Sequence, residues 1–315
     1  MSKDIVRRVD QVINKVSYSP AQTRTGQFNM LPDDALLEIF EFYVDEDMGE
    51  VFELFKKQRM EEWVTLAHVC RRWRSIVFQS PRRLNLRLLC THKTRARDIL
   101  DVWPPSLPLI IHDSYDILNR RHGISGVGDI TTALEHNDRV CQIKLRYLTS
   151  SQLEHIKDSA AMQKPFPELT DLHLRIFVDD GIGRMIPDSF LNGTAPRLRS
   201  LYLDGILFPG LPKLLLSSAA HLAKLDLYGI PDSGYIPPET MAISISVLTS
   251  LEFLRLHFRY PRPRLALESR RPPPPTRSIL PGLTEFRFKR EQRIFGGDLG
   301  PGRYPPTQLF TCNLL

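Results

Sequence analysis

The sequence of 315 residues has little cysteine and no long apolar run. Its four cysteines contain no C-x-x-C pair, and they are too sparse for a disulfide scaffold. The most apolar long stretch, residues 207–223, is interrupted by prolines and is shorter than the ~20 apolar residues of a bilayer crossing. The sequence therefore favours a reducing compartment, cytoplasmic or nuclear, and predicts no membrane span.

Catalytic and ligand-binding motifs are lacking too. None of the nine histidines forms an H-x-x-x-H or H-E-x-x-H pair, and no serine stands in a G-x-S-x-G elbow. Gly123, Gly126 and Gly128 have the reverse of the dinucleotide-binding order. We therefore expect no metal, no cofactor and no enzymatic activity in the chain itself.

Basic residues are concentrated in one segment. The net charge is +6, yet residues 71–97 alone hold nine basic residues and no acidic one. Such a strip can neutralise phosphates, so a nucleic-acid-binding protein is an alternative function. Against this alternative, the strip has no helix-turn-helix or zinc-finger spacing, and Trp73 and Phe78 fall on the apolar face of a predicted helix.

Two helical patterns precede residue 82. Leu31-Pro32 is followed by Asp33, Asp34 and an apolar stripe, which predicts a helix that runs to about Tyr43. Apolar residues at steps of three and four predict a second helix from Trp63 to Val77, ending before Pro81. The two helices are expected to share one apolar face.

A second pattern begins near residue 140. The spacing L-x-x-L-x-L occurs six times, with 24 to 32 residues between successive starts, at 140–145, 169–174, 198–203, 222–227, 251–256 and 283–288. Each unit predicts a strand whose alternating apolar residues are buried, followed by a helical or irregular return. Weaker strands are expected at 84–88 and 107–111. The fold class is therefore α/β, and a leucine-rich-repeat solenoid is favoured over an unrelated α/β fold with similar strands.

Several stretches resemble a known family. "LPDDALLEIFEFY" followed by "WVTLAHVCRRWRSIVFQSPRRLNLRL" resembles an F-box, and "DVWPPSLPLIIHD", "APRLRSLYLDGI" and "SGYIPPETMA" resemble the fungal F-box proteins with leucine-rich repeats. The resemblance covers residues 29–289. Together with the composition of the two ends, the resemblance predicts five parts in the chain: a flexible leader (1–28), an F-box domain (29–82), a junction with irregular first repeats (83–139), a leucine-rich-repeat domain (140–290) and a disordered tail (291–315). The tail departs from the family pattern, which would continue into further repeats.

The same resemblance implies a function. Members of the family are non-catalytic receptors of SCF-type (cullin-RING) ubiquitin ligases, in which the F-box binds a Skp-type adaptor and the repeats bind the protein to be degraded. Carried over to this sequence, the adaptor-binding residues are Leu31, Pro32, Leu36, Ile39, Phe40, Trp63, Leu66, Val69, Cys70, Trp73 and Ile76. The alternative is that these apolar residues only fill the core of a helical subdomain. Residues 45–62 are longer and more charged than the middle of a compact F-box.

The residues between the repeated leucines predict a substrate-binding surface. On a strand these positions point away from the core, so aromatic and charged side chains gather on one face of the sheet. The candidate substrate-binding residues are Tyr202, Asp204, Asp226, Tyr228, Arg255, His257 and Arg287. Aromatic residues beside a cationic patch suit a peptide with an apolar side chain and acidic or phosphorylated residues. Alternatively, these residues are only the solvated outer face of a repeat sheet.

Overall fold

The chain divides into two compact units. The first, called here the helical unit, comprises Met1–Leu89 and Val102–Pro108, and the second, the sheet unit, comprises Cys90–Asp101 and Leu109–Leu315. The computed structural model describes residues 31–44, 62–81, 83–84, 86–91, 96–113, 127–178, 185–231, 236, 238–258, 280–290 and 308–313. The predicted leader 1–28 and the F-box middle 45–61 lie outside these residues.

Three helices lie in the described part of the helical unit. They are α2 (Asp33–Val44), α4 (Glu62–Val69) and α5 (Arg71–Gln79). The helix predicted to start after Leu31-Pro32 is confirmed as α2. The single helix predicted from Trp63 to Val77 is wrong, because the backbone of Cys70 is extended (φ −158°, ψ 171°) and separates α4 from α5.

Cysteine at this break caps the helix that follows it. The Sγ atom of Cys70 accepts a hydrogen bond from the backbone N–H of Trp73 at 3.4 Å. This bond satisfies one of the first N–H groups of α5, which have no partner within the helix. Cys70 therefore separates α4 from α5 and serves as the N-cap of α5.

The sheet unit is built on strands that lie side by side in their order along the chain. The sheet has the order β1-β2-β3-β4-β5-β6-β7-β8-β9. Every pair from β2/β3 to β7/β8 is parallel, and β8/β9 is antiparallel. The strands are β1 (Leu88–Thr91), β2 (Leu109–His112), β3 (Val140–Thr149), β4 (Asp171–Val178), β5 (Ser200–Asp204), β6 (Lys224–Ile230), β7 (Phe253–Phe258), β8 (Glu285–Arg290) and β9 (Gln308–Asn313).

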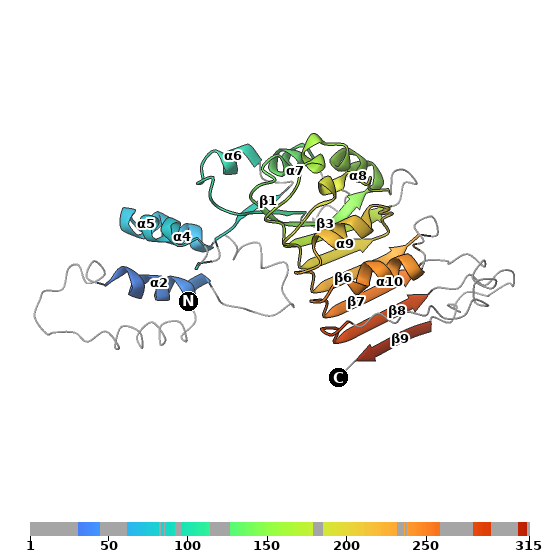
Figure 1. Cartoon of the computed structure of the whole chain (residues 1–315). Helices are drawn as coiled ribbons and strands as arrows, with labels where there is room; N and C mark the ends of the chain where they lie inside the picture. The colour runs from blue at the N-terminus through green and yellow to red at the C-terminus, as the bar shows by residue number, and fades with distance from the viewer. Residues whose placement is uncertain are drawn as a thin grey trace, which may run out of the picture. The chain divides into compact units, whose positions relative to one another are not determined.

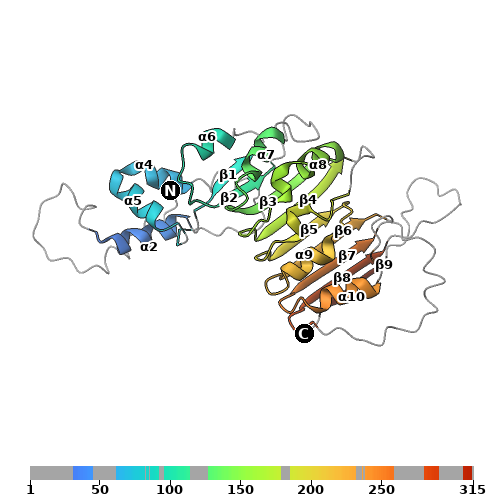
Figure 2. The same cartoon turned by 45° about the horizontal axis from the view of Figure 1, so that its top comes forward.

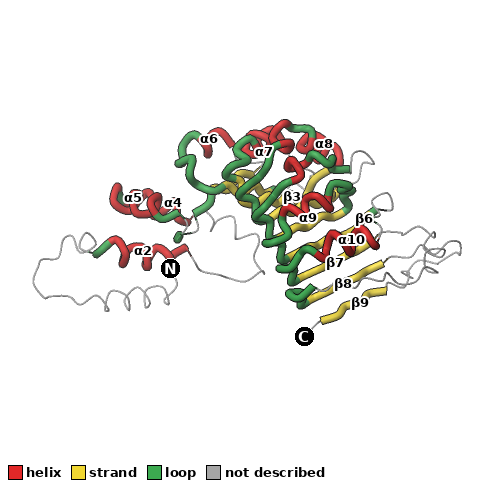
Figure 3. The backbone as a smooth tube through the Cα atoms, viewed as in Figure 1, coloured by secondary structure: helices red, strands yellow, loops and turns green. Residues whose placement is uncertain are grey.

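Helices and turns join the parallel strands. They are α6 (Ala96–Leu100), α7 (Val127–Leu134), α8 (Ser150–Lys157), α9 (Leu211–Ser217), α10 (Pro238–Ser246) and the 3-10 turns η3 (Ala160–Gln163) and η4 (Phe190–Gly193). Figure 1 shows α9 and α10 lying against one face of the strands of the sheet unit, and the turned view in Figure 2 agrees. Figure 3 shows how loop, helix and strand alternate along this unit. Parallel strands need such crossover segments between them.

The core of the sheet unit is made by the recurring leucines. Leu172, Leu201, Leu225 and Leu254 are register partners from strand to strand and are buried. The six strands predicted from the spacing are confirmed as β3 to β8. In β8 the residues at the repeated positions, Phe286 and Phe288, are half-buried rather than buried. The sheet unit is an α/β structure with a parallel sheet.

The two ends of the sheet differ from the sequence-based expectation. Strands β1 and β2 start at Leu88 and Leu109, later than the weak strands predicted at 84–88 and 107–111. Within the expected disordered tail 291–315, the structure has strand β9, which pairs with β8. The rest of that tail lies outside the described residues.

Candidate protein-interaction surfaces

Arginine side chains fasten α5 to α2 in the helical unit. The guanidinium of Arg72 donates to Asp33 Oδ1 at 2.6 and 3.1 Å and to the carbonyl oxygen of Leu31 at 2.5 Å. Arg83, just beyond α5, pairs with Glu41 near the end of α2. The acidic residues of α2 therefore neutralise part of the basic strip at residues 71–97.

The predicted adaptor-binding residues divide into a buried and an accessible set. Six of them, Leu31, Leu36, Phe40, Trp63, Leu66 and Ile76, are buried in the core. Ile39 and Trp73 are half-buried, and the ring of Trp73 lies 4.7 Å from that of Phe40. Pro32, Val69 and Cys70 are exposed. The accessible set therefore consists of these three exposed residues and the two half-buried ones, and it is the part of the prediction that can contact a partner directly.

A segment beyond the F-box resemblance completes the aromatic core of the helical unit. The ring of Trp103 lies 5.1 Å from Trp63, 6.1 Å from His68 and 6.1 Å from Phe78, with edge-to-face geometry in each pair. The indole N–H of Trp63 donates to the carbonyl oxygen of Arg87 at 3.2 Å. The sequence pattern predicts only a junction at residues 83–139 and does not reveal this role of Trp103.

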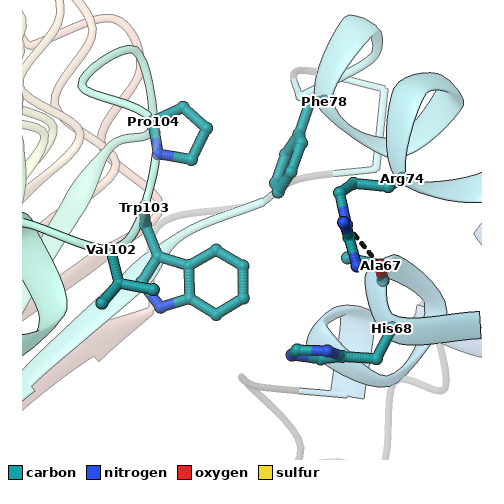
Figure 4. Close-up of a pocket in the computed structure, with 7 residues that line it drawn as sticks. All are labelled: Ala67, His68, Arg74, Phe78, Val102, Trp103 and Pro104. Atoms are coloured by element: carbon teal, nitrogen blue, oxygen red, sulfur yellow. Dashed lines mark hydrogen bonds between the residues drawn. The ribbon is translucent and has the colours of Figure 1, made fainter. Parts of the chain in front are cut away.

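An open pocket adjoins this aromatic cluster. It has a volume of about 540 Å³ and is lined by Ala67, His68, Arg74, Phe78, Val102, Trp103 and Pro104. Figure 4 shows the indole of Trp103 directed toward Phe78 and His68. The Nε–H of Arg74 donates to the carbonyl oxygen of Ala67 at 2.9 Å, so its charged group is held at the pocket wall.

On the sheet unit, the predicted substrate-binding residues lie on adjacent strands. Tyr202 of β5 is the register partner of Asp226 of β6, which in turn faces Arg255 of β7. Arg287 of β8 continues the same row. Asp204 and Tyr228 are partners one step further along the strands. The structure therefore brings these residues together, as the alternation of the strands predicts.

Three ion pairs run across this face. Arg255 binds Asp226 through Nε and Nη2, with Nε 2.7 Å from Oδ1. Arg175 Nε lies 3.2 Å from Asp204 Oδ2, and Arg287 pairs with Glu285 two residues before it on β8. The arginines predicted to form a cationic patch are thus each paired with a carboxylate.

Aromatic rings lie between the ion pairs. His173 stacks on Tyr202 with ring centres 3.9 Å apart, and Tyr228 packs on His257 at 4.2 Å. Burial, together with the charges of Asp204 and Asp226, raises the pKa of Tyr202 to about 12. Tyr202 therefore stays neutral at physiological pH and donates its hydroxyl proton to Asp204 at 3.3 Å.

A glycine positions the Tyr228–His257 pair. Gly229 has φ 61°, in the left-handed region that favours glycine, where the β6/β7 register shifts. Its N–H donates to Nδ1 of the buried His257 at 3.3 Å. His257 was predicted to contact substrate, but in the structure it is 1% exposed and supports Tyr228 from below.

Comparison with known proteins identifies one domain. Residues 28–87 match the F-box-like family model. No curated protein matches the chain. The matched range contains α2, α4 and α5, so the region with the arginine and aromatic contacts is an F-box-like domain. A domain of this type indicates a protein-interaction adaptor, and F-box domains typically bind Skp-type adaptors.

In the part of the chain that the structure describes, no group of three or more His, Cys, Asp or Glu residues could hold a metal ion. Among the described helices, none combines the length and the apolar composition that a membrane-spanning helix requires.

Proposed function

We propose that this chain is a non-catalytic substrate receptor of an SCF-type ubiquitin ligase. The helical unit binds a Skp-type adaptor of the cullin-RING core. The sheet unit is a leucine-rich-repeat solenoid that binds the substrate protein. The observation that carries the proposal is the F-box-like match at residues 28–87 on a helical unit that leaves apolar side chains exposed.

Exposed apolar residues support adaptor binding. Val69 at the end of α4 is 56% exposed and Phe42 on α2 is 46% exposed, although other apolar residues of the same helices are buried. Pro32 at the start of α2 is exposed as well. A small helical unit that covers such residues with a partner gains apolar burial that its own core does not provide.

The strand arrangement supports the repeat assignment. The parallel strands follow one another in chain order, and their leucines occupy equivalent register positions. This order supports a solenoid, in which each repeat would bury the leucines of its neighbour. Such a sheet presents a continuous row of side chains to a bound protein.

The alternative function, nucleic-acid binding by residues 71–97, has less support. Arg72 and Arg83 form salt bridges with Asp33 and Glu41 of α2. A phosphate backbone would have to displace these carboxylates. We expect weak, non-selective binding to duplex DNA or RNA that disappears as salt approaches physiological levels.

Adaptor binding is tested with charge substitutions at exposed apolar positions. Val69→Glu places a carboxylate in the proposed interface, so we expect it to weaken binding to a purified Skp-type adaptor by at least about tenfold. Leu216→Glu is the matched control, because Leu216 on α9 of the sheet unit is 55% exposed. Calorimetry measures both affinities, and circular dichroism verifies that each variant is folded.

The two possible results are distinct. Loss of affinity in Val69→Glu alone supports docking through the helical unit. Wild-type affinity in Val69→Glu, or no adaptor binding by the unmodified chain, contradicts the proposed function.

A further inference from the structure

We propose that the strand face around Tyr202 and Arg255 binds an acidic peptide segment, rich in Asp or Glu, of the captured protein. This proposal rests on the proposed function, in which the sheet unit binds substrates. It adds the chemical class of the segment that is recognised. The strand positions concerned are those that point away from the leucine core.

Relative exposure decides which charge a partner meets. In the pair Arg175–Asp204 the side chains are 44% and 7% exposed, and in Arg255–Asp226 they are 29% and 11% exposed. The pair Arg287–Glu285 follows the same order, at 44% and 29%. In all three pairs the guanidinium is the more exposed partner. A bound segment therefore touches the cations first.

The central guanidinium is held in place before any ligand binds. Asp226 fixes Arg255 through two of its N–H donors, and the guanidinium carbon lies 5.6 Å from the ring centre of Tyr228 and 5.9 Å from that of Phe253. Arg287 lies over the same Phe253 ring at 5.6 Å. These side chains are thus already ordered in the free protein, so binding a ligand loses less side-chain entropy.

Donor groups remain for a second carboxylate. A guanidinium carries five N–H donors, and Asp226 accepts from the Nε and Nη2 side of Arg255. A carboxylate from a partner suits the remaining donors, since arginine binds carboxylates side by side. The charge of Arg255 is already compensated by Asp226, so a singly charged carboxylate fits this position better than a doubly charged phosphate.

The neighbouring rings add a neutral contact surface. Tyr202 keeps its proton at physiological pH and stacks on His173, so its ring adds no negative charge to the face. Tyr228 is half-exposed beside Arg255. Aromatic rings next to cations form the kind of anchor that interfaces use most.

The experiment measures binding of labelled peptides to the full-length chain without adaptor. The probes are a Glu-rich peptide with one Phe, and versions with Gln, Lys or phosphoserine in place of Glu. Fluorescence anisotropy at physiological salt is expected to show at least about tenfold tighter binding of the Glu peptide than of the Gln or Lys peptides. Binding of the Glu peptide should weaken as salt increases.

Variants locate the site. Arg255→Ala and Arg175→Ala should each weaken the Glu peptide by at least about tenfold. Arg197→Ala is the matched control, because it removes an arginine that pairs with Glu168 at 2.5 Å in the loop before β5. It should change the affinity by less than about twofold. Asp226→Asn keeps an amide oxygen that can accept from Arg255 and removes the negative charge beside it, so binding of the Glu peptide should be retained.

Several results would overturn the proposal. They are equal binding of the Glu and Lys peptides, equal loss in Arg197→Ala, or a phosphoserine peptide or single-stranded RNA that binds more than about tenfold tighter than the Glu peptide. Because no adaptor is present, failure here leaves the adaptor result for Val69→Glu unaffected. Peptide binding by a chain that fails to bind adaptor would retain this surface and reject the ligase assignment.

Discussion

The two units of this protein differ in how they separate core from surface. In the helical unit, six of the eleven residues predicted to bind an adaptor are buried in the chain's own core. In the sheet unit, the leucines are buried while Tyr202, Arg255 and Arg287 lie on the other face of the same strands. The strand period of two assigns alternate residues to opposite faces, whereas a short helix shares its few apolar residues between core and partner.

This difference determines whether a substitution can separate an effect on binding from an effect on folding. A change at a buried residue of the helical unit affects folding and binding together. A change on the outer strand positions of the sheet unit leaves the leucine layers in place. Binding experiments on the helical unit must therefore use exposed residues such as Val69.

The largest effect is expected at the aromatic centre of the helical unit. Trp63 is buried and contacts Trp103 and Phe78, so Trp63→Ala removes a large side chain from the centre of the aromatic cluster. We expect the free energy of unfolding of this unit to fall by about 3–5 kcal/mol. Chemical denaturation followed by hydrogen exchange should show that the helical unit opens while the sheet unit stays protected.

The control for this prediction lies on the same helix. Val69→Ala also shortens an apolar side chain of α4, but Val69 is exposed, so the unfolding free energy should change by less than about 0.5 kcal/mol. Equal effects of the two substitutions would show that Trp63 is not a core residue. Loss of protection in both units would contradict their division.

The corresponding weak point of the sheet unit is a buried carboxyl group. Asp113, which follows β2, is 0% exposed, and its Oδ2 accepts from the backbone N–H groups of Arg146 and Tyr147 at 2.5 Å each. Its Oδ1 is buried without a hydrogen bond. Burial, partly offset by these two bonds, raises the pKa of Asp113 to about 6.

This pKa sets the sign of a pH effect. Between the usual value of 3.8 and about 6 the folded state binds the proton more tightly than the unfolded state. The contribution of Asp113 to the unfolding free energy is therefore lost as pH rises through this window, by on the order of 3 kcal/mol. Urea unfolding at several pH values should show this slope in the wild type and a flatter curve in Asp113→Asn. Parallel curves would exclude Asp113 as its source.

Much of the sheet unit is predictable from the sequence. The six repeated strands follow from the leucine spacing, because the alternation of side chains between two faces is a property of each strand alone. The same alternation predicts that their outer residues share one face. The pairing of each arginine with a particular carboxylate was not predicted, since it depends on register between strands and on side-chain conformations.

The helical unit is less predictable for a different reason. The break at Cys70 depends on a single extended residue within an otherwise continuous apolar period. The contribution of Trp103 depends on a contact with Trp63 across 40 positions of sequence. The sequence offers one signal for this contact, which is that Trp103 precedes Pro104 and Pro105. The prolines disfavour a helix or strand, and a large aromatic side chain in such a loop is a candidate for packing on a neighbouring core.

The smallest effect concerns the ion pair that joins α5 to α2. Asp33 and Asp34 both lie in the first turn of α2, where the helix dipole stabilises either carboxylate. In the described structure, only Asp33 forms a salt bridge to Arg72. Asp33→Asn should therefore lower the unfolding free energy by about 0.2–1 kcal/mol more than Asp34→Asn. The Asp33 carboxylate is 62% exposed, so high salt should remove the difference. Thermal unfolding of both variants at low and high salt measures it, and equal stability of the two at low salt would show that the Arg72 contact contributes nothing.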